Sequence, residues 1–252
     1  MKGLRTTEVL RVYERFAATN LGSDGIRPGG LELTGKALDL AGLDPGSTII
    51  DIGCGSGVSL NFIKEHYVDL RCFGLDLSAE MLKIAGRSDV KLDLVRGSVA
   101  ELPFEDNSAD AILMECSLSL MNYSEESCFE LNRVLKSDGL LMLSDVYARD
   151  SVAHNPFNAA AFDCCLKGAI TQEDIVKRLE ASGFELRLWE DHSQALKDFT
   201  VRVILGSDSV EEFWGPFFGR FECCDLAGND APPFRPGYFL AQARKRFSLI
   251  DR

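Results

Sequence analysis

From about residue 48 onward, apolar runs of strand length alternate with segments that have the periodicity and end signals of helices. This alternation is typical of βαβ units and predicts an α/β fold with a mostly parallel sheet and helices on both faces. The seven predicted strands are Thr48–Asp51, Arg71–Asp76, Leu92–Arg96, Ala109–Glu115, Leu140–Val146, Glu185–Glu190 and Gly237–Lys245.

Helices are predicted between these strands by their capping residues. The segment "SEESCFELNRVLKSDG" begins with Ser124 as an N-cap and is predicted to end at Gly139. In the same way, "TQEDIVKRLEASGF" begins with Thr171 and ends at Gly183, and "SAEMLKIAGR" forms a shorter helix. Each helix would cross from one predicted strand to the next.

Three segments do not follow the alternation, namely residues 1–44, 147–170 and 192–236. In open α/β sheets the ligand crevice lies outside the carboxyl ends of the strands, so insertions after strands fall beside it. We expect these segments to form a small cap that sets substrate specificity. The whole chain, 1–252, would then be a single domain, with a core of about 45–146, 171–190 and 237–245.

Composition excludes several classes of partner. The formal net charge is -12, so a nucleic-acid backbone or an anionic membrane would be repelled by most of the surface. The N-terminus has no signal-peptide run, and charges interrupt each apolar stretch before it reaches membrane-spanning length. We therefore expect a cytoplasmic protein with reduced thiols and a small-molecule partner, and the oligomeric state stays open.

A glycine loop follows the first predicted strand. Gly53, Gly55 and Gly57 are spaced G-x-G-x-G before a helix, whereas a dinucleotide fingerprint would be G-x-G-x-x-G and here has Val58 at the sixth position. Glycine is needed where φ is positive or where a ligand approaches the main chain too closely for a Cβ. The loop therefore predicts a close ligand, and its spacing disfavours a nicotinamide dinucleotide.

An acidic residue stands at the tip of the second predicted strand. Asp76 lies nineteen residues after Gly57, and an acid in this place can accept hydrogen bonds from both hydroxyls of a ribose. Loop and acid together predict a nucleoside ligand. An NAD-dependent oxidoreductase is kept as an alternative.

Four motifs resemble those of the class I S-adenosylmethionine-dependent methyltransferases. "DIGCGSG" (Asp51–Gly57) resembles the first motif and "GLDLSAEML" (Gly74–Leu82) the second. "VRGSVAELPFEDNSADAILMECSLSLM" (Val95–Met121) resembles the third and fourth, and "RVLKSDGLLMLSDV" (Arg133–Val146) the helix and strand that follow. The resemblance covers about residues 45 to 146, with "GYFLAQARK" as the closing strand. It implies a Rossmann-like fold and an enzyme that uses S-adenosylmethionine and yields S-adenosylhomocysteine.

The resemblance also implies roles for individual residues. Asp51 would lie near the cofactor's ammonium group, and Asp76 would hold the ribose diol. Ser98 stands where the family often has an acidic residue that receives the adenine amino group. The cofactor-binding residues implied are Asp51, Gly53, Cys54, Gly55, Gly57, Asp76, Leu77, Met81, Ser98, Val99 and Glu115. Among these, Cys54 fills the loop, Leu77 and Met81 pack on adenine, and Glu115 borders the methionine moiety.

Methyl transfer from a sulfonium needs no fixed catalytic signature. The protein must align a nucleophile with the S–CH3 bond and exclude water, and a general base is needed only if the nucleophile loses a proton. We name Tyr147 and His192 as catalytic candidates, because both follow strands beside the crevice and His192 could titrate near neutrality. Arg27 could pair with a carboxylate of the cofactor or of the acceptor.

Two pairs of adjacent cysteines lie in the insertions. Cys165-Leu-Lys-Gly168-Ala169 resembles a Cys-x-x-Gly-Ala stretch of arsenite methyltransferases, in which thiolates bind trivalent arsenic, and Cys224 would be the second thiolate. The alternative is that these cysteines only pack in the core. A noncatalytic module that binds the cofactor or a soft metal is a further alternative. The acceptor and the atom methylated stay open at this point.

Overall fold

The computed structural model describes residues 27–67, 69–121, 124–150, 164–206 and 234–246, together with Val152, Asn155 and Asn158. All structural statements below concern these residues. The elements in chain order are α2 (Gly30–Ala41), β1 (Thr48–Ile52), α3 (Val58–His66), β2 (Arg71–Asp76), α4 (Ala79–Ala85), β3 (Asp93–Arg96), β4 (Ala109–Glu115), the 3-10 helix η2 (Ser119–Met121), α5 (Glu125–Val134), β5 (Leu135–Ala148), α6 (Gln172–Ala181), β6 (Phe184–Asp191), α7 (Ser193–Gly206) and β7 (Pro236–Lys245).

The strands form one seven-stranded sheet in the order β3-β2-β1-β4-β5-β7-β6. β1 to β5 pair in parallel, whereas β7 lies antiparallel between β5 and β6. The prediction of a seven-stranded, mostly parallel α/β sheet is therefore confirmed. The order reverses between β1 and β4, which is the position where open α/β sheets bind ligands at the carboxyl ends of their strands.

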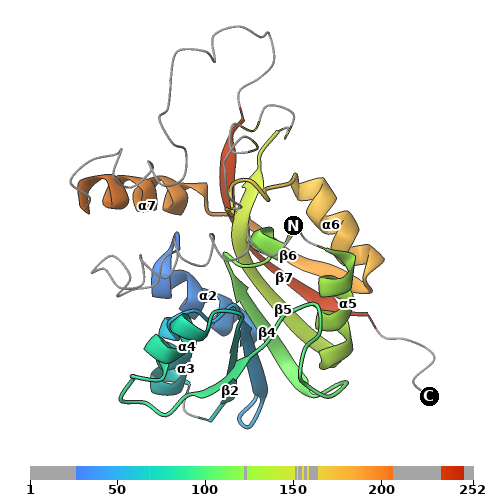
Figure 1. Cartoon of the computed structure of the whole chain (residues 1–252). Helices are drawn as coiled ribbons and strands as arrows, with labels where there is room; N and C mark the ends of the chain where they lie inside the picture. Colours follow the sequence, from blue (N-terminus) through green and yellow to red (C-terminus); the bar gives the residue numbers. More distant parts are fainter. Residues whose placement is uncertain are drawn as a thin grey trace, which may run out of the picture.

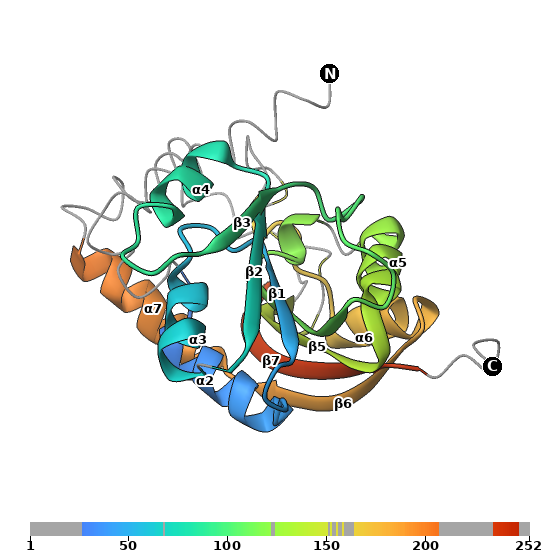
Figure 2. The same ribbon diagram turned by 90° about the horizontal axis from the view of Figure 1, so that it is seen from below.

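Helices cover both faces of the sheet (Figures 1 and 2). α2, α3 and α4 lie on one face and α5 and α6 on the other, as Figure 2 shows. Each face of the sheet has its own hydrophobic core. Alternate residues of β1 pack in one core or the other, because successive side chains of a strand point to opposite faces. Ile49 packs in the cluster that contains Leu33 and Leu60, and Ile50 packs in the cluster that contains Leu131 and Leu179.

Predicted helix starts agree with the structure, but one predicted helix is too long. α5 begins after Ser124, whose side chain accepts a hydrogen bond from the Ser127 N–H, but it ends at Val134 and not at Gly139. The prediction was wrong at this end because Leu135 takes up an extended backbone and is fully buried at the start of β5. The backbone N–H groups of Asn107 and Ser108 bond the last carbonyls of the helix, so its end is satisfied without a further turn.

Two helices lie in segments that had been assigned to the cap. α2 packs on the sheet through Leu33, Ala37 and Leu38, and its Ala37 carbonyl accepts a hydrogen bond from the Gln242 side chain on β7. α7 follows β6 directly. Much of the predicted cap lies outside the described residues, so the cap and the single-domain organisation stay predictions. Among the described helices, none has both the length and the apolar character needed to cross a membrane.

Candidate functional site

The glycine loop connects β1 to α3 at the carboxyl end of the sheet. The N–H groups of Gly53 and Cys54 both donate to the Leu75 carbonyl of β2, at 2.8 and 3.1 Å, which holds the loop against the neighbouring strand. Gly53 has a φ of +80°, and a Cβ there would lie 2.7 Å from the Ser117 Cβ. Gly57 has a φ of +77° and caps α3. Side chains at these two positions are therefore excluded by both conformation and space.

Asp76 lies beside this loop at the end of β2. Its Oδ2 accepts a hydrogen bond of 2.8 Å from the Gly55 N–H, and its Oδ1 accepts one of 2.8 Å from the Ser78 N–H. The carboxylate is only half-buried. Two backbone donors thus fix the orientation of the carboxylate.

Four further residues of the predicted set lie around Asp76. The Gly97 N–H donates to the Asp76 carbonyl at 3.1 Å, which brings the turn of Ser98 and Val99 to the end of β2. Leu77 is 42% exposed, and Met81 is 9% exposed. A Cβ at Gly55 would lie 3.2 Å from the Met81 Cε, so Met81 reaches the loop. Ser98 bonds its own turn, because its Oγ accepts from the Ala100 N–H at 3.2 Å.

Cys54, in the middle of the loop, is buried. A Cβ at Gly74 would lie 2.9 Å from its sulfur, so the thiol fills the space beside β2. Burial is the main cause that raises the pKa of this thiol, and the charges of Asp51 and Asp76 raise it further. The thiol is therefore held in its neutral form, which fits a packing role.

Glu115, at the end of β4, is the centre of a buried polar cluster. Its Oε2 lies 3.1 Å from the Arg27 Nη2 and accepts a hydrogen bond of 2.6 Å from the Ser59 hydroxyl. Its Oε1 accepts one of 2.8 Å from the Thr34 hydroxyl, which itself accepts from the Arg27 Nη2 at 2.6 Å. The resemblance implied that Glu115 borders the methionine moiety, and it gave the side chain no partners. No sequence motif pointed to Thr34 or Ser59, because their meeting depends on how α2 and α3 pack.

Asp51, the last acidic residue before the loop, is almost fully buried. It is 2% exposed, and its Oδ2 has no hydrogen-bond partner in the described part of the chain. Burial is the main cause that raises the pKa of Asp51 well above its usual range, and Glu115 adds to the effect while Arg27 opposes it. Arg27 Nε is likewise buried, and it has no partner among the described residues. Buried polar groups without partners are rare and mark sites where a ligand can supply the missing contact.

Tyr147, a catalytic candidate, is buried at the end of β5. Its ring packs edge-on against Trp189 and Phe239, and its hydroxyl donates to the Asp191 Oδ2 at 3.0 Å. Burial is the main cause that raises the pKa of Tyr147, and the hydrogen bond to Asp191 raises it further. The phenol is therefore a hydrogen-bonded core group on the α5 and α6 side of the sheet.

His192, the second candidate, lies just after β6. Its Nε2 is 2.8 Å from the Glu190 Oε2, and the same carboxylate oxygen is 2.5 Å from Lys36 on α2. These contacts join the sheet edge to α2. They link His192 through Glu190 to Lys36, away from the glycine loop of β1 in strand order.

The thiol candidates are only partly described. Cys165 is half-buried in the turn that follows β5, whereas Cys224 lies outside the described residues. The structure adds Cys116, which has a φ of +51° and a sulfur 3.3 Å from the Tyr238 hydroxyl. Burial is the main cause that raises the pKa of Cys116, and Asp145 and then Cys165 raise it further, so the two cysteines lie within electrostatic range. Within the described ranges, no three His, Cys, Asp or Glu side chains gather as a metal site.

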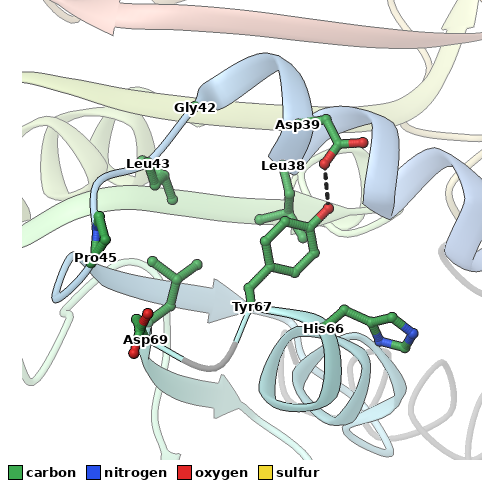
Figure 3. Close-up of a pocket in the computed structure, with 9 residues that line it drawn as sticks. Leu38, Asp39, Gly42, Leu43, Pro45, His66, Tyr67 and Asp69 are labelled. Atoms are coloured by element: carbon green, nitrogen blue, oxygen red, sulfur yellow. Dashed lines mark hydrogen bonds between the residues drawn. The ribbon is translucent and has the colours of Figure 1, made fainter.

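A separate pocket of about 350 Å³ lies at the other end of the sheet (Figure 3). Pro45 and Leu70 line it just before β1 and β2, and Tyr67 donates to Asp39 across it at 2.6 Å. His66 points away from Tyr67 in this view. Because the glycine loop and Asp76 are at the carboxyl ends of the strands, this pocket is not part of their site.

Proteins of known family and function have sequences similar to the part of this chain that contains the glycine loop. Residues 50–143 match a family model described as a methyltransferase domain. The demethylmenaquinone methyltransferase of Renibacterium salmoninarum is 34% identical over 110 residues, which cover 43% of this chain and 45% of that protein. The arsenite methyltransferase of Halobacterium salinarum is 28% identical over 162 residues, which cover 60% of this chain and 40% of that protein.

The fold is also found in solved structures. The [4+2]-cyclase SpnF superposes with a TM-score of 0.73 at 22% sequence identity, covering 98% of this chain and 95% of the cyclase. The likeness to SpnF shows the fold alone, whereas the sequence matches concern the domain that contains the loop. Residues 50–143 of this chain are therefore similar to a methyltransferase domain, within a fold that solved structures share. The matched stretches span less than half the length of either curated relative.

Proposed function

We propose that this protein transfers a methyl group from S-adenosylmethionine to a small-molecule acceptor. One observation carries the proposal: a buried carboxyl oxygen, Asp51 Oδ2, and a buried guanidinium nitrogen, Arg27 Nε, both lack hydrogen-bond partners among the described residues. The amino-acid end of the cofactor has the two complementary charges. Its ammonium would bind Asp51, and its carboxylate would bind Arg27.

The other residues of the site suit the nucleoside end of the cofactor. Asp76, fixed by two backbone donors, would accept the ribose hydroxyls. Leu77 and Met81 would pack on adenine, with Ser98 and Val99 at its edge. Gly53, Cys54, Gly55 and Gly57 would line the path between the two ends, and Glu115 would keep Arg27 in position.

The bound cofactor supplies a methyl group that is already activated on a sulfonium. The tasks left to the protein are to hold the methyl donor, to orient the acceptor in line with the S–CH3 bond and to exclude water. A proton acceptor is required only when the acceptor atom carries a proton. Arsenite and quinones, which the names of the two relatives suggest, are the first acceptors to assay.

Calorimetric titration with S-adenosylhomocysteine tests the proposed cofactor site. Hydrogen bonds to a charged group contribute about 1.5–3 kcal/mol, so Asp76→Asn should weaken binding by about 10- to 150-fold. The exposed Asp69→Asn, at the opposite end of the sheet, is the matched control and should bind as the wild type does. Absence of binding by the folded wild type would refute the proposal, and binding of NADH in its place would support the oxidoreductase alternative.

A second candidate is a protein that holds the cofactor without consuming it. One fold can host unrelated chemistry, as the occurrence of this fold in a [4+2]-cyclase illustrates, so cofactor binding without methyl transfer is tested beside the first proposal. Mass spectrometry of the cofactor after incubation with acceptors separates the two. Conversion to S-adenosylhomocysteine supports transfer, and a bound but unchanged cofactor with every acceptor supports the second candidate.

The thiol mechanism is tested with arsenite as acceptor. If Cys165 and Cys224 hold trivalent arsenic, the Cys165→Ser and Cys224→Ser variants should each lose the methylated product. Cys128→Ser is the matched control, because Cys128 is fully buried on α5. Equal product from the wild type and the two variants would eliminate thiolate ligation.

A further inference from the structure

Three carboxylates and one guanidinium meet at the glycine loop within the described part of the chain. Asp76 accepts two backbone N–H groups, and Glu115 is paired with Arg27 and bonded by two hydroxyls. The Oδ2 of Asp51 is buried, and the described residues offer it no donor. The Nη2 of Arg27 contacts Glu115 and Thr34, so these contacts do not provide a hydrogen bond to Asp51.

We propose that the ligand-free site carries a proton on Asp51, and that binding of the cofactor's ammonium group displaces this proton into solvent. The inference rests on the proposed function and deepens it, because it assigns a pH-dependent affinity to the same site. The ammonium group of the ligand would donate the hydrogen bond that Asp51 Oδ2 does not receive from the described residues.

The groups around Asp51 support the proton. Glu115 faces it from β4, Asp76 from β2, Arg27 from the segment before α2, and the neutral thiol of Cys54 follows it in the loop. Two of these are like charges, and removal from water disfavours a charged carboxylate as well. Burial and the two neighbouring acids accordingly raise the pKa of Asp51, and the positive charge of Arg27 opposes this rise.

An ammonium group within hydrogen-bonding distance reverses this balance. It favours the charged form of the carboxylate, so the pKa of Asp51 falls when the ligand binds. Between the pKa values of the bound and the free protein, close to one proton should leave for each ligand bound. The affinity should then rise by up to about tenfold for each pH unit across that window.

Calorimetry in buffers with different ionisation enthalpies measures the number of protons released. With wild-type protein and S-adenosylhomocysteine between about pH 5.5 and 8.5, we expect a release that reaches nearly one proton. Methylthioadenosine provides the control in the same protein, because it has the nucleoside and the thioether but no ammonium. Its binding should release no proton and should not vary with pH in this range.

The Asp51→Asn variant assigns the proton to this residue. It should bind S-adenosylhomocysteine with buffer-independent heat, whereas Asp69→Asn should retain the release. Retained release in folded Asp51→Asn would overturn the inference, and so would buffer-independent heat for the wild type at every pH. These two results would leave the proposed function standing, whereas absence of any binding would refute both.

Discussion

At the scale of single residues, two buried aspartates differ in how their oxygens are satisfied. Asp145 accepts hydrogen bonds from the Ser119 N–H and hydroxyl and from the Val146 N–H, at 2.7 to 2.8 Å. Burial raises its pKa to about 6, and these hydrogen bonds limit the rise. Asp51 has no such donor at its Oδ2 in the described residues. The first carboxylate therefore has a structural role, and the second is suited to a ligand.

This difference predicts opposite effects of one substitution on stability. Because the folded protein raises the pKa of Asp51, the folded state binds the proton more tightly, and stability falls as pH rises from about 4 toward that raised pKa. Asp51→Asn removes this pH-dependent loss of stability. Because an amide cannot ionise, the variant avoids the cost of charging this buried group, and we expect a gain of about 1–3 kcal/mol near pH 8 and a smaller gain near pH 5.

Thermal unfolding of the ligand-free protein at several pH values measures this gain. Asp145→Asn is the control. The NH2 group of the new side chain would face the N–H donors of Ser119 or Val146, so this variant should lose about 1–3 kcal/mol of unfolding free energy. A melting temperature of Asp51→Asn below that of the wild type at alkaline pH would contradict the argument.

At the scale of elements, α2 is held to the sheet by polar contacts along its length. Arg27 and Thr34 reach Glu115 on β4, the Ala37 carbonyl accepts from Gln242 on β7, and Lys36 pairs with Glu190 on β6. The first of these contacts is buried, whereas the last is partly exposed. The Arg27 ion pair should therefore dominate the docking of this helix.

Arg27→Met tests that contact. Removing one partner of a buried pair leaves an uncompensated charge, which typically costs about 3–5 kcal/mol, and here Glu115 would lose its cation. The double variant with Glu115→Gln should recover part of the loss in urea unfolding. Arg235→Met, which breaks an exposed pair with Asp150, should change stability little. Strictly additive effects of the two buried substitutions would show that the pair is not coupled.

At the scale of the whole molecule, the strand order brings the acids together. β1 lies between β2 and β4, and Asp51 pairs with Gly74 on one side and Leu113 on the other. Asp76 and Glu115 each stand two residues beyond these partners, so all three acids reach the carboxyl edge at adjacent strands. α2 and α3 then cover the Glu115 side and supply Arg27, Thr34 and Ser59. The site is thus a consequence of the crossover between β1 and β4.

Much of this arrangement follows from the sequence by itself. Apolar runs, capping serines and threonines and the glycine spacing are local signals, so they predicted the seven strands, most helix starts, the loop and its relation to Asp76. Local signals failed where burial decided the outcome. Leu135 ended α5 early because its side chain is buried in the core. α2 was missed because its N-cap is Gly29, which offers no side-chain capping signal.

Only the tertiary structure decided the charges of the site. Whether a carboxylate is paired depends on partners far away in the chain, and the sequence gives no distance between Arg27, Thr34, Ser59 and Glu115. Folding buries all four together and leaves Asp51 Oδ2 without a donor in the described residues. The sequence therefore determined the class of ligand through backbone shape, whereas packing determined which of its acids could still bind a cation, because desolvation and pairing are properties of the assembled core.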